Sequence, residues 1–75
     1  MRTATIGPDD VYQALYDLAT EVQRRHRSHL RELRIEAVEG GVALRGRAVT
    51  FYGKQIAFHE VSRRVAVIAN RIEVQ

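Results

Sequence analysis

A pair of glycines separates two stretches in which apolar and polar side chains alternate. Residues 33–38 and 42–48 place an apolar side chain or Gly at every second position, and Glu39, Gly40 and Gly41 separate them. Side chains of a strand alternate between the faces of a sheet, and Gly supplies the positive φ that tight hairpin loops need. The pattern therefore predicts a β-hairpin. Its inward side chains would be Leu33, Ile35, Ala37, Val42, Leu44 and Gly46.

The segment before the hairpin has the pattern of an amphipathic helix from Gly7 to about Ser28. Pro8 occupies the first helical position, where its missing N–H costs nothing, and Asp9 and Asp10 face the positive end of the helix dipole. Apolar side chains recur at spacings of four, three and four, which defines one buried stripe. The stripe consists of Val11, Leu15, Leu18 and Val22.

A second helix and a third strand complete the chain. Thr50 is a plausible N-cap for a helix over residues 51–64, and Gly53 should weaken its first turn. Residues 68–74 alternate again and predict the closing strand. The side chains that this helix and its exit offer to the core are Phe51, Ile56, Ala57, Val61 and Val65.

The order helix, strand, strand, helix, strand predicts an α+β domain with the topology αββαβ. Each amphipathic element has one face to bury, so both helices should cover one face of a three-stranded sheet. The chain has 75 residues and no Cys, so it has one thin core and no disulfide to support it. We expect a single domain over residues 7–75, preceded by a flexible N-terminal segment over residues 1–6.

Basic residues are concentrated downstream of the first helix. Residues 1–23 contain one Arg and four carboxylates, whereas residues 24–75 contain ten Arg, one Lys and five Glu. The guanidinium group suits bidentate contact with phosphate or carboxylate, so anionic partners are worth considering. Strand parity predicts four of these residues on the face of the sheet that the helices leave open. They are Arg34, Arg45, Arg47 and Arg71.

A second basic cluster should surround the end of the first helix. It contains Arg24 and Arg25, with Arg27 and Arg31 beside them, and these positive groups would complement the negative end of the helix dipole. For both clusters the alternative is a solvated surface whose charge is balanced by Glu. The open sheet face and the helix end are therefore rival candidate sites for an anionic partner.

The remaining polar residues predict no active site, metal site or cofactor site. His26 and His29 lack a third ligand at matching spacing, and the adjacent His59 and Glu60 point about 100° apart on a helix without a placed nucleophile. We expect no enzyme activity and no small-molecule substrate. Asn70 has inward parity and should hydrogen-bond to the backbone.

Two motifs resemble the BON domain, which is named for bacterial osmotically inducible and nodulation proteins. Residues 39–46 read Glu-Gly-Gly-Val-Ala-Leu-Arg-Gly, and residues 65–74 read Val-Ala-Val-Ile-Ala-Asn-Arg-Ile-Glu-Val. With the preceding helix the resemblance covers nearly the whole chain. One departure is Arg64, which stands where the family usually has Gly before the Val that follows the second helix. Gly46 should permit close approach of a helix to the sheet.

The resemblance implies an αββαβ fold with a mixed sheet, no catalysis, and attachment to phospholipid membranes or to other cellular components. It carries no family-wide binding residue onto this chain. The sequence alone leaves two further functions open, which are nucleic-acid binding through the Arg-bearing face and protein interaction or self-association through a sheet edge. No export signal is recognisable, so we expect a cytoplasmic protein, or a periplasmic one if the chain belongs to a longer exported parent.

Overall fold

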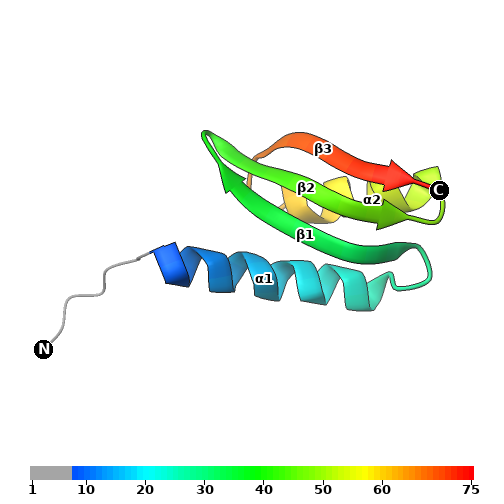
Figure 1. Ribbon diagram of the computed structural model, residues 1–75, viewed down its shortest axis with the longest axis horizontal. Helices are drawn as coiled ribbons and strands as arrows, with labels where there is room; N and C mark the ends of the chain where they lie inside the picture. Colours follow the sequence, from blue (N-terminus) through cyan, green and yellow to red (C-terminus); the bar gives the residue numbers. More distant parts are fainter. Residues whose placement is uncertain (1–7) are drawn as a thin grey trace, which may run out of the picture.

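The computed structural model describes residues 8–75 and contains two helices and three strands (Figure 1). The predicted flexible segment, residues 1–6, lies outside the described residues. The elements are α1 (Pro8–Arg25), β1 (Leu30–Val38), β2 (Gly41–Ala48), α2 (Phe51–Ser62) and β3 (Val67–Val74). This order confirms the predicted αββαβ topology.

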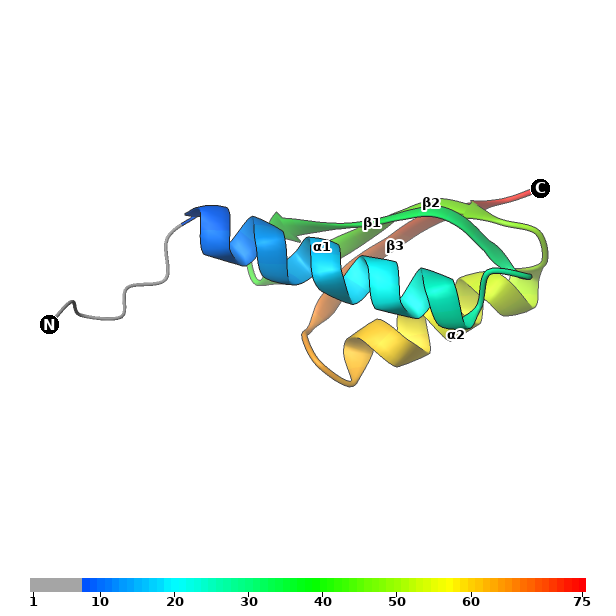
Figure 2. The same cartoon turned by 90° about the horizontal axis from the view of Figure 1, so that it is seen from below.

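The three strands form one mixed sheet with β2 in the centre. β1 pairs antiparallel with β2 through the Glu39–Gly40 turn, and β3 pairs parallel with β2 on the other side. The parallel pairing requires the chain to cross the sheet between β2 and β3, and α2 makes that crossing. Both helices lie on the same side of the sheet, with α1 along β1 and α2 beneath β2 and β3 (Figure 2).

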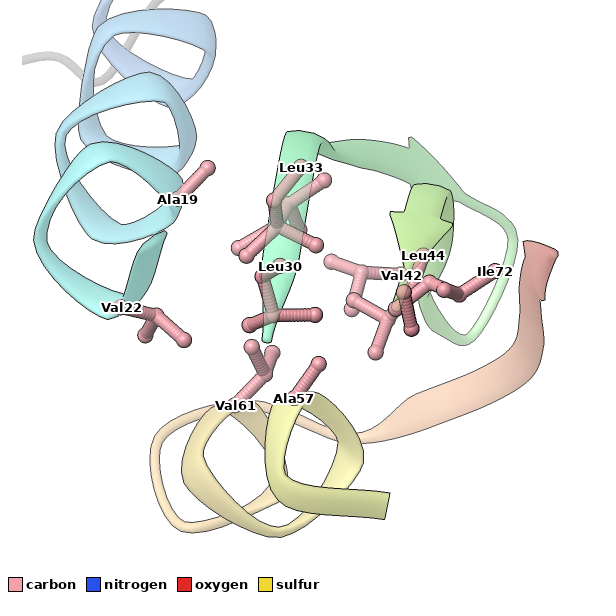
Figure 3. Close-up of a cluster of buried hydrophobic side chains, with 11 residues drawn as sticks. Ala19, Val22, Leu30, Leu33, Val42, Leu44, Ala57, Val61 and Ile72 are labelled. Atoms are coloured by element: carbon pink, nitrogen blue, oxygen red, sulfur yellow. The ribbon is translucent and has the colours of Figure 1, made fainter. Parts of the chain in front are cut away.

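The core lies between the sheet and the two helices, and every described element contributes to it (Figure 3). Leu44 is completely buried at the centre of β2, and Ala57 and Val61 of α2 are buried beneath it. The predicted inward side chains of Leu33, Ile35, Val42 and Leu44 are all buried. The full cluster is Ala19, Val22, Leu30, Leu33, Ile35, Val42, Leu44, Ala48, Ala57, Val61 and Ile72.

A β-bulge in β1 makes the strand longer than predicted. The register shifts between Arg31 and Arg34, and Glu32 has a φ of 56°. The extra residue resets the alternation, so that Leu30 and Leu33 both face the core although they are three positions apart. The strand therefore begins at Leu30 and not at Leu33.

Gly46 faces this bulge across the strand pair. It has a φ of 140°, and a Cβ atom there would lie 2.8 Å from the carbonyl oxygen of Glu32 and 3.0 Å from the Cα of Leu33. The expected close approach is therefore between two strands, and the prediction that Gly46 accommodates a helix was wrong. Ala37 is exposed, which corrects its predicted place in the core, and it lines an open groove beside Tyr12 of α1.

The first helix ends three residues earlier than expected. The chain turns at residues 26–29, where the N–H groups of His29 and Leu30 donate to the carbonyl oxygen of His26 at 2.8 and 2.9 Å. This turn leads directly into β1. Because the bulge extends β1 back to Leu30, the helix must end at Arg25.

The second helix begins where the sequence predicts. The Oγ1 atom of Thr50 accepts a hydrogen bond from the N–H of Gly53 at 3.1 Å, which confirms the N-cap. A Cβ atom on Gly53 would lie 2.6 Å from the carbonyl oxygen of His29, so this Gly lets α2 approach the α1–β1 turn. Phe51 is 61% exposed, and its predicted place in the core was wrong.

Candidate anion-binding surface

Strand register aligns three arginines in one row across the sheet. Arg34 of β1 lies directly opposite Arg45 of β2, and Arg45 pairs in turn with Arg71 of β3. Neighbouring strands lie about 4.8 Å apart, and residues in register project on the same face. This face is the one opposite the helices. The three guanidinium groups therefore belong to one continuous surface, which we call the Arg row.

The next row adds another arginine and a carboxylate. Arg47 of β2 lies opposite Arg31 and beside Glu73 of β3. The four arginines predicted for the open face line a single open hollow together with Glu32 and Glu73. Arg31, predicted with the helix-end cluster, is placed by the bulge in register with Arg47 on the sheet, and both line a hollow with Gln23 of α1.

Two glutamates balance only part of this charge. The Nε atom of Arg45 lies 2.9 Å from Oε1 of Glu36, and the Nε atom of Arg47 lies 3.4 Å from Oε1 of Glu32. Arg34 and Arg71 make no ion pair with any residue in the part of the chain that the structure describes. The Arg row thus has one neutralised guanidinium between two that are not.

Two alanines border the Arg row on one side. Ala43 is only 4% exposed because it lies on the central strand between Glu36 and Ala69. It belongs to no part of the core cluster on the helix side. Small side chains therefore border the Arg row on this side, and no aromatic side chain among the described residues of the three strands stands on the open face.

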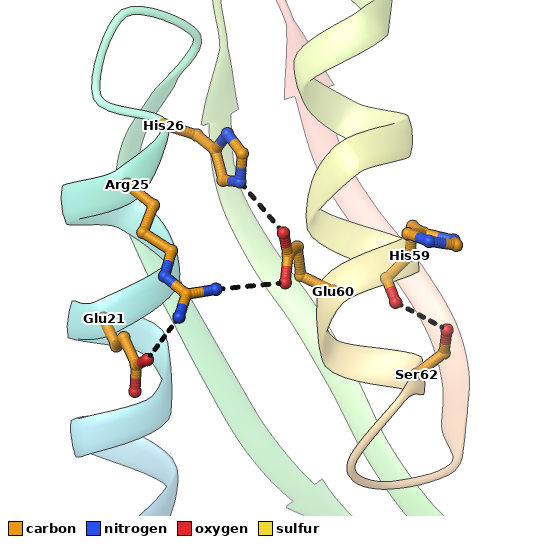
Figure 4. A network of polar contacts seen from close by, with 6 residues as sticks. All are labelled: Glu21, Arg25, His26, His59, Glu60 and Ser62. Atoms are coloured by element: carbon orange, nitrogen blue, oxygen red, sulfur yellow. Dashed lines mark hydrogen bonds and ion pairs between the residues drawn. The ribbon is translucent and has the colours of Figure 1, made fainter.

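The rival cluster at the end of α1 is partly tied into the fold. Arg25 contacts Glu21 with Nη2 at 3.1 Å and Glu60 of α2 with Nη1 at 3.7 Å, and His26 reaches the same Glu60 at 3.2 Å (Figure 4). These contacts join α1 to α2. Arg24 and Arg27 are exposed and line a groove that also reaches Arg34. Arg25 is thus a structural residue as well as a predicted site residue.

The same network fixes the ionisation of Glu60. The hydrogen bond from His26 lowers the pKa of this carboxyl below its ordinary value of 4.5, burial opposes the shift, and the charges of His26, Arg25 and Arg63 add to it. His59 lies apart from this network, and its carbonyl oxygen accepts a bond from Ser62 Oγ at 3.1 Å (Figure 4). Glu60 therefore serves as an anchor between helices.

Asn70 and His29 also make structural contacts. The Nδ2 atom of Asn70 donates to the carbonyl oxygen of Lys54 at 3.1 Å, and its Oδ1 accepts from the N–H of Ile72 at 3.3 Å, as its inward parity predicted. The His29 ring packs edge-on against Tyr52 with centroids 5.2 Å apart. Within residues 8–75, no three side chains of the His, Asp and Glu types gather as metal ligands would.

Comparison of the chain with protein-family models, with curated proteins and with solved structures finds no match. The BON resemblance therefore rests on the motifs around Gly40 and Asn70 alone. No helix in the described part of the chain is long and apolar enough to cross a bilayer.

Proposed function

We propose that this protein is a non-catalytic binding module of the BON type that attaches to anionic phospholipid surfaces through its open sheet face. The single observation that carries the proposal is the Arg row, in which Arg34, Arg45 and Arg71 stand side by side with only Arg45 paired to a carboxylate. Like charges directly opposite one another on a sheet are destabilising. A bound anion would relieve that repulsion.

The shape of the face suits a planar partner. Three guanidinium groups in one row on an open sheet can reach a bilayer at once, and each basic residue near an anionic membrane contributes about 1 kcal/mol. Guanidinium groups also make bidentate contacts with phosphate oxygens. Leu15, Leu18 and Val22 of α1 pack against or within the core, so this apolar stripe is not available for insertion. Attachment should therefore be peripheral and sensitive to salt.

The absence of catalysis is part of the proposal. His59 and Glu60 do not converge, and the pKa of Glu60 is lowered, which favours the ionised form and leaves a poor proton donor at neutral pH. Nucleic acid is the competing partner for a basic face, but single-strand binding by sheets of this kind relies on aromatic side chains that stack with bases. The exposed aromatic residues Tyr12, Tyr16, Phe51, Tyr52 and Phe58 all lie on the helices.

Co-sedimentation with vesicles tests the proposal. The protein is mixed at low salt with vesicles of phosphatidylcholine alone or of phosphatidylcholine with an equal amount of phosphatidylglycerol, and single-stranded DNA is added as a competitor. We expect binding only to the anionic vesicles, and loss of binding at high salt, because exposed charges are screened beyond about 8–10 Å at physiological ionic strength. Equal binding to both vesicle types, or full displacement by DNA, would refute the assignment.

A further inference from the structure

The two edges of the sheet differ in how well they are covered. At the β1 edge, α1 lies alongside the strand, and the Oε1 atom of Gln23 accepts a hydrogen bond from the N–H of Leu33 at 2.5 Å. No described element packs beyond β3 on its outer side (Figure 1). β3 contains neither Pro nor Lys, two residues that commonly prevent an edge strand from pairing with another chain, and its register irregularity against β2 lies at Ile68, outside the segment around Ile72.

The backbone of β3 presents unused hydrogen-bonding groups at this edge. The N–H of Gln75 donates to the carbonyl oxygen of Ala48 on β2 at 2.9 Å, so the backbone groups at position 75 point into the sheet. Alternation along a strand then directs those of Ile72 outward. The Ile72 N–H finds only the Oδ1 atom of its neighbour Asn70, at 3.3 Å. A strand from another molecule would offer Ile72 a better acceptor.

The two residues that flank Ile72 carry opposite charges, so this segment is complementary to a second copy of itself. Arg71 and Glu73 stand on the open face at either side of it. If a second copy paired antiparallel with this strand about Ile72, Arg71 of each copy would face Glu73 of the other, twice over. A pair centred on Arg71 would instead place that residue against itself, and a pair centred on Asn70 would leave Glu73 opposite an apolar residue. The charges therefore select one register.

The helix beneath the edge fits the same arrangement. α2 contacts both β2 and β3, so its axis runs between them. Two β3 strands about 4.8 Å apart would place the α2 axes of the two copies about 10 Å apart, which is close to the 8–10 Å of packed helices. A paired β3 edge would thus bring two helices into contact below the sheet.

An exposed aromatic residue lies where those helices would meet. Phe51, which is 61% exposed, stands three positions before Lys54, whose carbonyl oxygen is bonded to Asn70 of β3. Residues three apart share a helix face, so Phe51 lies on the β3 flank near the end of the sheet where Val74 is 44% exposed. Phe58 lies two turns further along, beyond the reach of an overlap centred on Ile72.

We propose that a second copy of this chain pairs with β3, antiparallel about Ile72, to form a two-fold dimer with a continuous six-stranded sheet. The axis of such a pair is perpendicular to the sheet, so both open faces point the same way and two Arg rows share one surface. In the dimer Arg71 of each row lies opposite Glu73 of the other copy, and Arg34 of each row stays unpaired among the described residues. The role of the dimer at membranes rests on the proposed function. Two linked sites bind a surface more tightly than one, so the dimer would strengthen that binding. The dimer itself needs no lipid.

Analytical ultracentrifugation over a range of protein concentrations, without lipid, tests the pairing. We expect concentration-dependent dimers for the native chain, about tenfold weaker association for Glu73→Arg, and recovery in the charge-swapped variant Arg71→Glu/Glu73→Arg. Glu39→Arg, an equal charge change in the hairpin turn, should associate normally. A native chain that stays monomeric, or a charge swap that fails to restore association of a folded variant, would overturn the proposal.

A second pair of variants tests the helix contact and separates the two proposals. Phe51→Ser should weaken association, whereas Phe58→Ser should not, and circular dichroism checks that both remain folded. Equal effects of the two changes would overturn the predicted register. Phe51→Ser should also weaken vesicle binding at least tenfold through loss of the second Arg row. A dimer that ignores anionic vesicles would refute the membrane function alone, and a monomer that binds them would refute the dimer alone.

Discussion

The Nε2 atom of His26 lies 3.2 Å from the Oε2 atom of Glu60, and this contact joins the end of α1 to the second half of α2. Arg25 holds the other carboxylate oxygen at 3.7 Å. The two helices otherwise share few contacts, since α1 packs mainly on β1 and α2 on β2 and β3. Glu60 is therefore the principal polar link between the helices.

This link should make stability depend on pH below 5. The folded-state pKa of Glu60 is lowered from 4.5, so the unfolded chain takes up a proton at a higher pH than the folded chain does. The contribution of Glu60 is thus present above about pH 4.5 and is lost as pH falls through the lowered folded value. Urea unfolding between pH 5 and pH 3 should show a smaller loss of stability for Glu60→Gln than for the native chain.

His59→Gln is the control for that measurement. His59 neighbours Glu60 in sequence, but its side chain is exposed and makes no hydrogen bond or ion pair with any described residue. Its substitution should leave the pH dependence below pH 5 unchanged. A Glu60→Gln profile parallel to the native one over the same range would contradict the proposed link.

Leu44 should be the most costly residue of the sheet to truncate. Its side chain is fully buried at the centre of β2, which lies between β1 and β3, and it faces α2. Leu44→Ala removes apolar contacts and leaves a cavity, which costs about 2–5 kcal/mol and is a large share of the stability of so small a domain. Chemical denaturation measures the change, and a loss below about 0.5 kcal/mol would show that Leu44 does not face the core.

Substitutions at Gly46 and Gly40 can be compared to test whether the bulge is held against β2. Both have positive φ, so Ala at either position carries about 1–3 kcal/mol of backbone strain. At Gly46 the new Cβ would also meet the β1 backbone at 2.8 Å, whereas at Gly40 it would lie 3.8 Å from Ile68 Cδ1, an ordinary contact. Gly46→Ala should therefore be the more destabilising change in thermal unfolding. The reverse order would mean that the bulge is not held against β2.

Local patterns were sufficient to predict the elements and most of the core. The Gly40–Gly41 pair, the Thr50 cap and the alternation around Leu44 each depend on residues close together in sequence, and each is found as predicted. The bulge depends on a contact between Glu32 and the distant Gly46, so alternation counted from Leu33 could not reveal it. The available signal was the spacing of three between Leu30 and Leu33, which does not fit the strict alternation of a regular strand.

The candidate site could also be predicted only in part, because its arrangement depends on contacts between residues that are distant in sequence. Parity places Arg34, Arg45 and Arg71 on one face, but only the strand register shows that they form a single row. Parity also cannot tell which of these arginines a carboxylate neutralises, because the contact of Arg45 with Glu36 joins two neighbouring strands and depends on their register. Phe51 was wrongly assigned to the core, because it occupies the first position of α2 and its side chain is 61% exposed.

Binding to anionic surfaces should depend on the Arg row. Arg34→Gln/Arg45→Gln/Arg71→Gln removes the row, and Arg24→Gln/Arg27→Gln/Arg64→Gln removes three exposed arginines elsewhere with the same loss of net charge. The decisive measurement is co-sedimentation of both folded variants with vesicles of phosphatidylcholine and phosphatidylglycerol at low salt. We predict that the first variant loses binding by at least tenfold, at about 1 kcal/mol for each arginine, while the second retains most of it. Equal losses, or a larger loss in the second variant, would contradict the claim.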